Sequence, residues 1–130
     1  MTKDDIGKFS YLVVDDDEFA RDVLGSTLGR IGATQVFYAG DAKTAFRMAQ
    51  QHRPDFIMLD IYMPEIDGWA FLERVRQVLP QVAVIMVTGS HHQADFSQSM
   101  EQRVDGFCIK PVMPDVMVKT LINARARRAA

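Results

Sequence analysis

Short apolar runs alternate with amphipathic stretches along nearly the whole chain. One such run, residues 56–59, has no polar interruption and ends on Asp60. A run of this kind predicts a short strand buried on both faces, and the amphipathic stretches between runs predict helices that cover them. The alternation therefore favours an α/β fold with a parallel sheet between two layers of helices. Strands are expected at residues 11–14, 34–39, 56–59, 83–87 and 107–109.

The helices expected between these strands have recognisable first and last residues. Gly32 stands where a helix-ending glycine belongs, and Asp41 can cap a helix that continues to about residue 51. The helix that begins at Gly68 is stopped by Pro80. A weak helix is expected at 91–103 and a last one from 113 to about 126. Apolar stripes are expected to turn Phe19, Ala20, Val23, Leu24, Leu28 and Ile31 of the first helix, and Val116, Leu121 and Ala124 of the last, toward the core.

Polar residues follow four of the five strands directly. Because crossovers between parallel strands are right-handed, all strands point the same way and their carboxyl ends meet at one edge of the sheet. Ligands bind at that edge in open α/β sheets. We therefore expect a carboxylate cluster, a hydroxyl group and an ammonium group to converge there, supplied by Asp15, Asp16, Asp17, Asp60, Thr88 and Lys110.

An acidic cluster of this kind predicts a divalent cation. Neighbouring carboxylates repel one another unless a cation is present, and Mg²⁺ needs only one or two of them beside its waters. Asp16 and Asp60 are the preferred direct ligands, with a backbone carbonyl near Tyr62 as a third. With the charge neutralised, Asp60 can attack phosphorus, while Lys110 and Thr88 contact the phosphoryl oxygens. The product would be an aspartyl phosphate, which is also a local charge switch.

Composition restricts the class of protein further. The 130 residues suffice for one domain, expected to have a core at about 10–126 and short tails, and 48% of them are hydrophobic. A net charge of -2 gives no reason to expect nucleic acid as a direct partner. Cys108 is the single cysteine, so no internal disulfide can form, which fits a cytoplasmic protein. No apolar run approaches the length of a membrane span, so membrane insertion is not expected.

Four ordered motifs together carry a family resemblance. They are Leu12-Val13-Val14-Asp15-Asp16-Asp17, Leu59-Asp60-Ile61-Tyr62-Met63-Pro64 with Asp67-Gly68, Val87-Thr88-Gly89, and Ile109-Lys110-Pro111. In these motifs the chain resembles the receiver domain of two-component response regulators, the chemotaxis-regulator family. The resemblance implies a flavodoxin-like, doubly wound (βα)5 fold with a five-stranded parallel sheet in the order 2-1-3-4-5.

The same resemblance implies a role for each matching residue. Asp60 would be the phosphoacceptor, supplied by a sensor histidine kinase or a histidine phosphotransfer protein in a reaction that requires Mg²⁺. The domain would catalyse only its own phosphorylation and dephosphorylation. Asp15 and Asp16 would be the acidic pair beside Asp60. The switch hydroxyl, the phosphate-contacting lysine and the aromatic switch residue would be Thr88, Lys110 and Phe107, and the positions that tune phosphoryl lifetime would be Tyr62 and Ser90.

Signal output is expected on the surface formed by residues 91–103, the strand at 107–109 and the last helix. Phosphoryl oxygens would draw Thr88 inward, and Phe107 would fill the space that Thr88 leaves, shifting a two-state surface that binds a downstream protein. The sequence leaves open whether phosphorylation also produces a homodimer.

Three rival functions are weighed against this one. A phosphatase of the haloacid dehalogenase type places a second acidic residue two positions after its nucleophile, where this chain has Tyr62. A flavin or nucleotide module needs a phosphate-binding loop after its first strand, where Asp15 to Asp17 would repel phosphate. A degenerate receiver would bind partners without phosphorylation, but this chain keeps all four motifs.

Overall fold

The computed structural model describes residues 1–60, 68–89 and 103–129, and it contains one sheet of five parallel strands. The strand order is β2-β1-β3-β4-β5, which confirms the flavodoxin-like fold. The strands are β1 (Ser10–Val14), β2 (Gln35–Ala39), β3 (Phe56–Leu59), β4 (Ala83–Gly89) and β5 (Gly106–Lys110). The helices are α1 (Glu18–Arg30), α2 (Ala42–His52), α3 (Gly68–Val78) and α5 (Pro114–Ala129), with a 3-10 helix, η1 (Lys3–Lys8), before β1.

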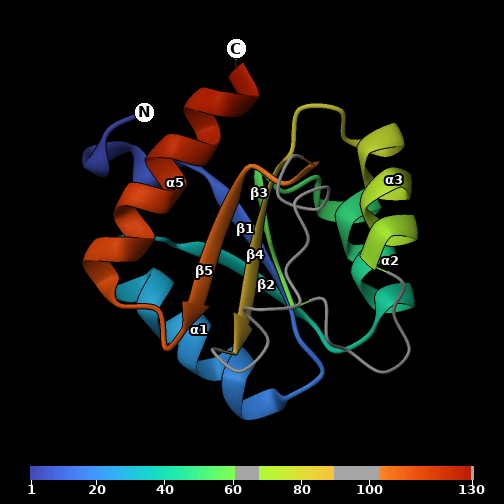
Figure 1. The fold of residues 1–130 in the computed structure, drawn as a ribbon, viewed down its shortest axis with the longest axis horizontal. Helices are drawn as coiled ribbons and strands as arrows, with labels where there is room; N and C mark the ends of the chain where they lie inside the picture. Colours follow the sequence, from blue (N-terminus) through green and yellow to red (C-terminus); the bar gives the residue numbers. More distant parts are fainter. Residues whose placement is uncertain (61–67, 90–102, 130) are drawn as a thin grey trace.

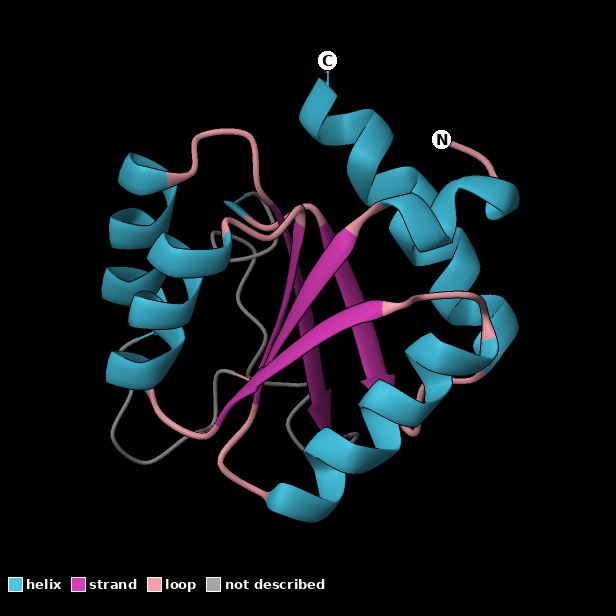
Figure 2. Ribbon diagram, turned by 180° about the vertical axis from the view of Figure 1, so that it is seen from behind, coloured by secondary structure: helices cyan, strands magenta, loops and turns pink. Residues whose placement is uncertain are grey.

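Helices cover both faces of the sheet, as the unbroken apolar strands predict. Figure 1 shows α1 and α5 together on one face and α2 and α3 on the other, and Figure 2 shows the same two layers from behind. Within β1, Leu12 and Val14 pack into the cluster beneath α2 and α3, whereas Tyr11 and Val13 pack into the cluster beneath α1 and α5. Every residue of β1 and β3 is buried, so the carboxyl ends of these two strands are firmly positioned.

Two predicted helix ends are confirmed, at Asp41 before α2 and at Gly32 after α1. Asp17 caps α1 by accepting a hydrogen bond from the Phe19 amide at 3.0 Å, and Asp41 caps α2 through the Thr44 amide at 2.7 Å. Gly32 follows α1 with a φ of 115°, a left-handed conformation that favours glycine. The weak helix expected at 91–103 lies outside the described residues, apart from Arg103.

Two of the predicted apolar stripes are wrong in part. Phe19 and Val23 of α1 are 76% and 43% exposed, and Val116 of α5 is 44% exposed. In α5 the core position is taken by Met117, which with Leu121 and Ala124 follows an i, i+4, i+7 spacing. Since neighbouring helix residues are 100° apart, burial of Met117 turns Val116 outward. In α1, burial of Leu24 and Leu28 likewise turns Val23 and Phe19 toward solvent.

The chain before β1 forms part of the core. Ile6 of η1 is fully buried, and the Tyr11 hydroxyl donates a 2.8 Å hydrogen bond to its carbonyl oxygen. Neither periodicity used for helices and strands marks so short a segment, and only an unspecified tail was expected there. At the other end, α5 continues to Ala129, beyond the expected end near residue 126. Within the described ranges, no helix has both the length and the apolar character that crossing a membrane requires.

Candidate functional site

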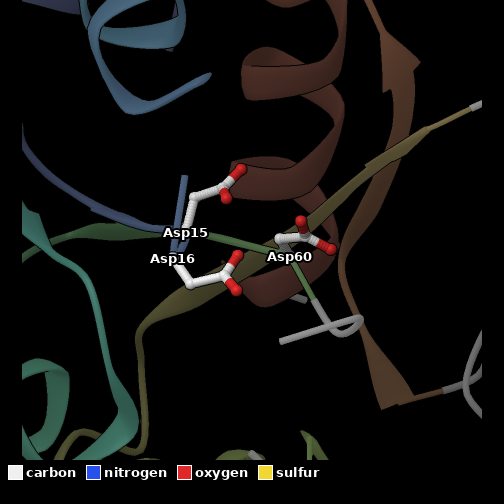
Figure 3. A group of neighbouring side chains, drawn as sticks. All are labelled: Asp15, Asp16 and Asp60. Carbon is white, nitrogen blue, oxygen red and sulfur yellow. The ribbon is translucent and has the colours of Figure 1, made fainter. Parts of the chain in front are cut away.

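The carboxyl ends of β1 and β3 bring three aspartates together. These strands are neighbours, and the chain leaves them toward opposite edges of the sheet, which creates the crevice where α/β proteins bind ligands. The Asp60 amide continues the sheet ladder by donating to the Val14 carbonyl at 3.0 Å, so its position follows from the register of β1 and β3. Figure 3 shows Asp15, Asp16 and Asp60 side by side, and one carboxylate oxygen from each lies within 4.8 Å of the other two.

Asp15 is the most deeply buried of the three carboxylates. Its side chain is 4% exposed, and one oxygen accepts a 2.9 Å hydrogen bond from the Asp17 amide. Its own carbonyl oxygen accepts a 2.7 Å hydrogen bond from Arg21 of α1. A Cβ on Gly40 would lie 2.8 Å from the Arg21 guanidinium, so Arg21 would have to shift if Gly40 carried a side chain. Arg21 was not predicted as part of the site, because no motif distinguishes it from the other polar residues of α1.

Lys110 neutralises part of the acidic cluster. Its ammonium nitrogen lies 2.6 Å from an Asp15 oxygen and 3.2 Å from an Asp60 oxygen. Burial by itself would lower the pKa of Lys110, but the hydrogen bond to Asp15 and the charge of Asp60 outweigh burial and raise that pKa. The ammonium therefore stays charged and holds the end of β5 against β1 and β3. The peptide bond from Lys110 to Pro111 is cis.

Thr88 and Phe107 occupy the strands beyond Asp60. Thr88 lies near the end of β4, opposite Ile109 of β5, and it is 1% exposed. Its hydroxyl has no hydrogen-bond partner among residues 1–60, 68–89 and 103–129. A buried hydroxyl without a partner is costly, which favours a role as donor to a ligand. Phe107 lies opposite Met86 and is partly buried against the cluster beneath α2 and α3.

Four of the predicted site residues therefore meet at one edge of the sheet. Two others lie outside the residues that the structure describes. Asp15, Asp16, Asp60 and Lys110 converge as the strand ends predicted. Asp17 instead caps α1 and is not part of the three-carboxylate group. Tyr62 and Ser90, the lifetime positions, lie in ranges that the structure does not describe. So does most of the stretch at 91–103 that was expected to join the output surface.

The donor atoms of the three aspartates suit a hard cation. Mg²⁺ prefers carboxylate oxygens and keeps several waters, and it does not need a closed cage of protein ligands. Asp16 is exposed and Asp60 is only partly buried, so water can reach the cluster. The group of Asp15, Asp16 and Asp60 could therefore hold a divalent ion with part of its coordination shell left for a ligand.

Comparison with known proteins identifies the domain. The family model for the response regulator receiver domain matches residues 11–122. The chain belongs to this family. The receiver domain is a module of two-component signalling, in which response regulators interact with histidine kinases and downstream effectors.

Individual relatives agree with this assignment. Response regulator Rre1 of Synechocystis sp. is 31% identical over 123 residues, which are 93% of this receiver domain and 53% of Rre1. Chemotaxis protein CheY of Bacillus subtilis is 28% identical over 110 residues, which are 85% of this chain and 92% of CheY. The chain thus spans about half the length of Rre1, and it also spans 46% of the probable transcriptional regulator ycf27 of Guillardia theta.

Solved structures share the fold. Chemotaxis response regulator CheY4 of Vibrio cholerae has a TM-score of 0.76 and 28% identity, covering 89% of this chain and 98% of CheY4. NtrX of Brucella abortus has a TM-score of 0.81 and 26% identity, covering 93% of this chain and 27% of NtrX.

Proposed function

We propose that the receiver domain accepts a phosphoryl group on Asp60 from a histidine kinase or a histidine phosphotransfer protein. The observation that carries this proposal is the position of the Asp60 carboxylate, which lies beside two further carboxylates and 3.2 Å from the Lys110 ammonium. Asp15, Asp16 and Asp60, with the backbone carbonyl of Tyr62, are the proposed ligands of Mg²⁺. The proposed compartment is the cytoplasm, where such donors phosphorylate their regulators.

The residues around Asp60 have distinct roles in the proposed reaction. An Asp60 oxygen forms a bond to phosphorus as the nitrogen–phosphorus bond to the donor imidazole breaks and the imidazole leaves with the electron pair. Bound Mg²⁺ would neutralise negative charge on the carboxylate and phosphoryl oxygens, so that a negative carboxylate could approach a negative phosphoryl group. Lys110 can turn one of its three N–H donors from the Asp60 oxygen to a phosphoryl oxygen. Asp15 keeps the ammonium in place throughout, because its own contact with Lys110 is shorter.

Asp60→Asn is expected to abolish stable phosphorylation. The amide keeps the size of the side chain but cannot form an acyl phosphate by attack on phosphorus. The measurement is the intact mass after incubation with acetyl phosphate, with and without Mg²⁺. Wild type should gain one phosphoryl group only with Mg²⁺, and the gain should be stable in acid and lost at alkaline pH. Asp22→Asn, an exposed α1 aspartate outside the cluster, is the control and should behave as wild type. Equal gain by Asp60→Asn would refute the assignment.

Thr88 and Phe107 are proposed to transmit the change at Asp60. The Thr88 hydroxyl, which has no partner among the described residues, would donate to a phosphoryl oxygen, and Phe107 would move into the space that Thr88 leaves. The output surface would be the one formed by residues 91–103, β5 and α5, which would bind a downstream protein or a second copy of the chain. Tyr62 is proposed to shield the phosphoryl group from water and Ser90 to tune its lifetime, so a half-life of only seconds would contradict the role of Tyr62.

Thr88→Ala is expected to leave phosphorylation largely intact while removing the response of β5. Without the hydroxyl, no donor links the phosphoryl oxygens to the end of β4. Amide resonances of Phe107 and Cys108 should shift on phosphorylation of wild type and stay near their unphosphorylated positions in the variant. Thr27→Ala, a buried threonine of α1 whose hydroxyl donates within its own helix, is the matched control and should respond as wild type. An unchanged response in Thr88→Ala would exclude this switch.

A further inference from the structure

A cleft of about 310 Å³ lies at the amino end of the sheet, away from the aspartate cluster. Its walls come from the residues that lead into β3 and β4, together with Arg125 of α5. Because parallel strands all start at one edge of the sheet, the length of β3 separates this cleft from Asp60. Figure 1 and Figure 2 both show the connection from α3 to β4 and the C-terminal end of α5 at this end of the sheet.

The cleft carries more positive than negative charge. Arg53 and Arg125 line it, and Asp55 supplies the one carboxylate among its described lining residues. One Asp55 oxygen already accepts hydrogen bonds from the Ser10 amide at 2.9 Å and from the Ser10 hydroxyl at 3.3 Å. The carboxylate is thus held by the start of β1, and the two guanidinium groups favour an anionic ligand.

Neither arginine is paired with a carboxylate of the described residues. Arg53 donates one long hydrogen bond, of 3.5 Å, to the Val78 carbonyl oxygen. The Arg125 guanidinium lies 4.8 Å from the centre of the Phe9 ring. A guanidinium over an aromatic ring is held in position but keeps N–H donors for a carboxylate. Weak contacts therefore orient both side chains and leave their donors available to a ligand.

Arg53 has a backbone conformation that favours glycine. It caps the C-terminal end of α2 with a φ of 47° and a ψ of 60°, in the left-handed region. Glycine is the usual residue at such a helix end, and a side chain costs free energy there. The bond to Val78 is too long to offset that cost. The Arg53 side chain is therefore expected to serve a purpose other than the stability of α2.

We propose that this cleft binds an acidic segment of a partner protein, whose aspartate or glutamate carboxylates pair with Arg53 and Arg125. Guanidinium groups suit carboxylates because they can donate two parallel hydrogen bonds. Leu79 and Val82 add apolar wall for a side chain between the acidic residues. This mixed lining favours a peptide over nucleic acid, since none of the described lining residues is an aromatic on which a base could stack. The proposal does not depend on phosphorylation of Asp60.

The test titrates a short synthetic peptide of glutamate and leucine into the isotope-labelled protein. Amide resonances of Arg53, Asp55, Arg125 and residues 81–82 should shift. A matched peptide with glutamine in place of glutamate should bind about tenfold more weakly, because it keeps the apolar contacts and loses the charge. The affinity of the glutamate peptide should also fall as salt is added, since salt screens exposed charges.

Arg53→Gly and Arg125→Gln should each weaken the affinity for the glutamate peptide about fivefold, the effect of one partly exposed ion pair. Arg53→Gly should not lower the free energy of unfolding, because glycine suits the left-handed backbone. Arg74→Gln is the matched control, since Arg74 of α3 lies 4.2 Å from the centre of the Phe46 ring and does not line the cleft. This control should bind the peptide as wild type does.

Several results would overturn the proposal. Equal affinity of wild type and Arg53→Gly, or equal affinity for the two peptides, would show that no carboxylate is recognised. A clear loss of unfolding free energy in Arg53→Gly would assign Arg53 to the end of α2 instead. Tighter binding of a single-stranded oligonucleotide, with the same shifts, would assign the cleft to nucleic acid. Concentration-dependent shifts without peptide, with a dimer mass in sedimentation, would assign it to a second copy. Acetyl phosphate should phosphorylate Arg53→Gly as it does wild type, which separates this proposal from the function of Asp60.

Discussion

Lys110→Met should lower the free energy of unfolding by about 2–3 kcal/mol in the absence of divalent cations. Removing one partner of a buried ion pair leaves the other charge uncompensated, which costs about 3–5 kcal/mol when burial is complete. The Lys110 side chain is 29% exposed, so a smaller value is expected here. Asp15, only 4% exposed, would then face Asp60 without the ammonium that now bonds to both. Chemical denaturation without Mg²⁺ measures the effect.

Mg²⁺ should raise the free energy of unfolding more in Lys110→Met than in wild type. In the variant the ion would replace the missing positive charge, and it would not compete with an ammonium group. Phosphorylation-dependent switching should weaken in the same variant, since the phosphoryl oxygens lose their cationic partner. Lys119→Met removes an exposed lysine from α5 and should change stability little. A Lys110→Met protein as stable as wild type without Mg²⁺ would show that the ion pairs contribute nothing.

Asp105→Ala is the second substitution with a large expected effect, a loss of about 3–5 kcal/mol of unfolding free energy. Asp105 is 3% exposed, and it joins three elements at the edge of the sheet away from the aspartate cluster. One oxygen accepts a 2.9 Å hydrogen bond from the Val84 amide and a 2.7 Å bond from Arg76 of α3. Arg128 of α5 lies 3.9 Å from the other oxygen. Alanine would leave the buried Val84 amide without its acceptor and would remove the negative charge that faces both arginines.

The electrostatics of this cluster explain why the loss should be large. Burial lowers the pKa of Arg76 even though Asp105 opposes that change, so the guanidinium depends on its partner in a poorly solvated place. Glu73→Ala is the matched control, because Glu73 lies 3.7 Å from Arg103 with both side chains more than half exposed. Exposed pairs contribute little, so about 0.5 kcal/mol or less is expected. Equal losses for Asp105→Ala and Glu73→Ala in urea denaturation would contradict the account.

The sequence predicted the fold because its signals are local and consistent. Short runs of apolar, β-branched and aromatic residues identified all five strands, and Asp41 and Gly32 identified helix ends that the structure confirms. Convergence of Asp15, Asp60 and Lys110 followed from strand direction alone, since residues after parallel strands share an edge. The strand order required the family resemblance, because apolar runs do not specify which strands are neighbours.

The orientation of individual side chains and the contacts between distant segments could not be predicted from the sequence. The sequence pattern of α1 allowed more than one rotation of the helix about its axis relative to the core. In the structure Leu24 and Leu28 pack into the core, and Phe19 is exposed. The partners of Asp105 lie 29 and 21 positions away in the chain, and no spacing rule links them. Ile6 belongs to a single 3-10 helix too short to show a periodicity. Each of these features depends on which surfaces meet in three dimensions.

The central claim, that Asp60 carries the phosphoryl group, is tested most directly by chemical trapping of the modified residue. Borohydride reduces an aspartyl phosphate to homoserine, so the protein is phosphorylated with acetyl phosphate and Mg²⁺, reduced, digested and sequenced by mass spectrometry. Homoserine at position 60, and none without Mg²⁺, is the expected result. Homoserine at position 15 or 16, or phosphate that resists borohydride on another residue, would contradict the account.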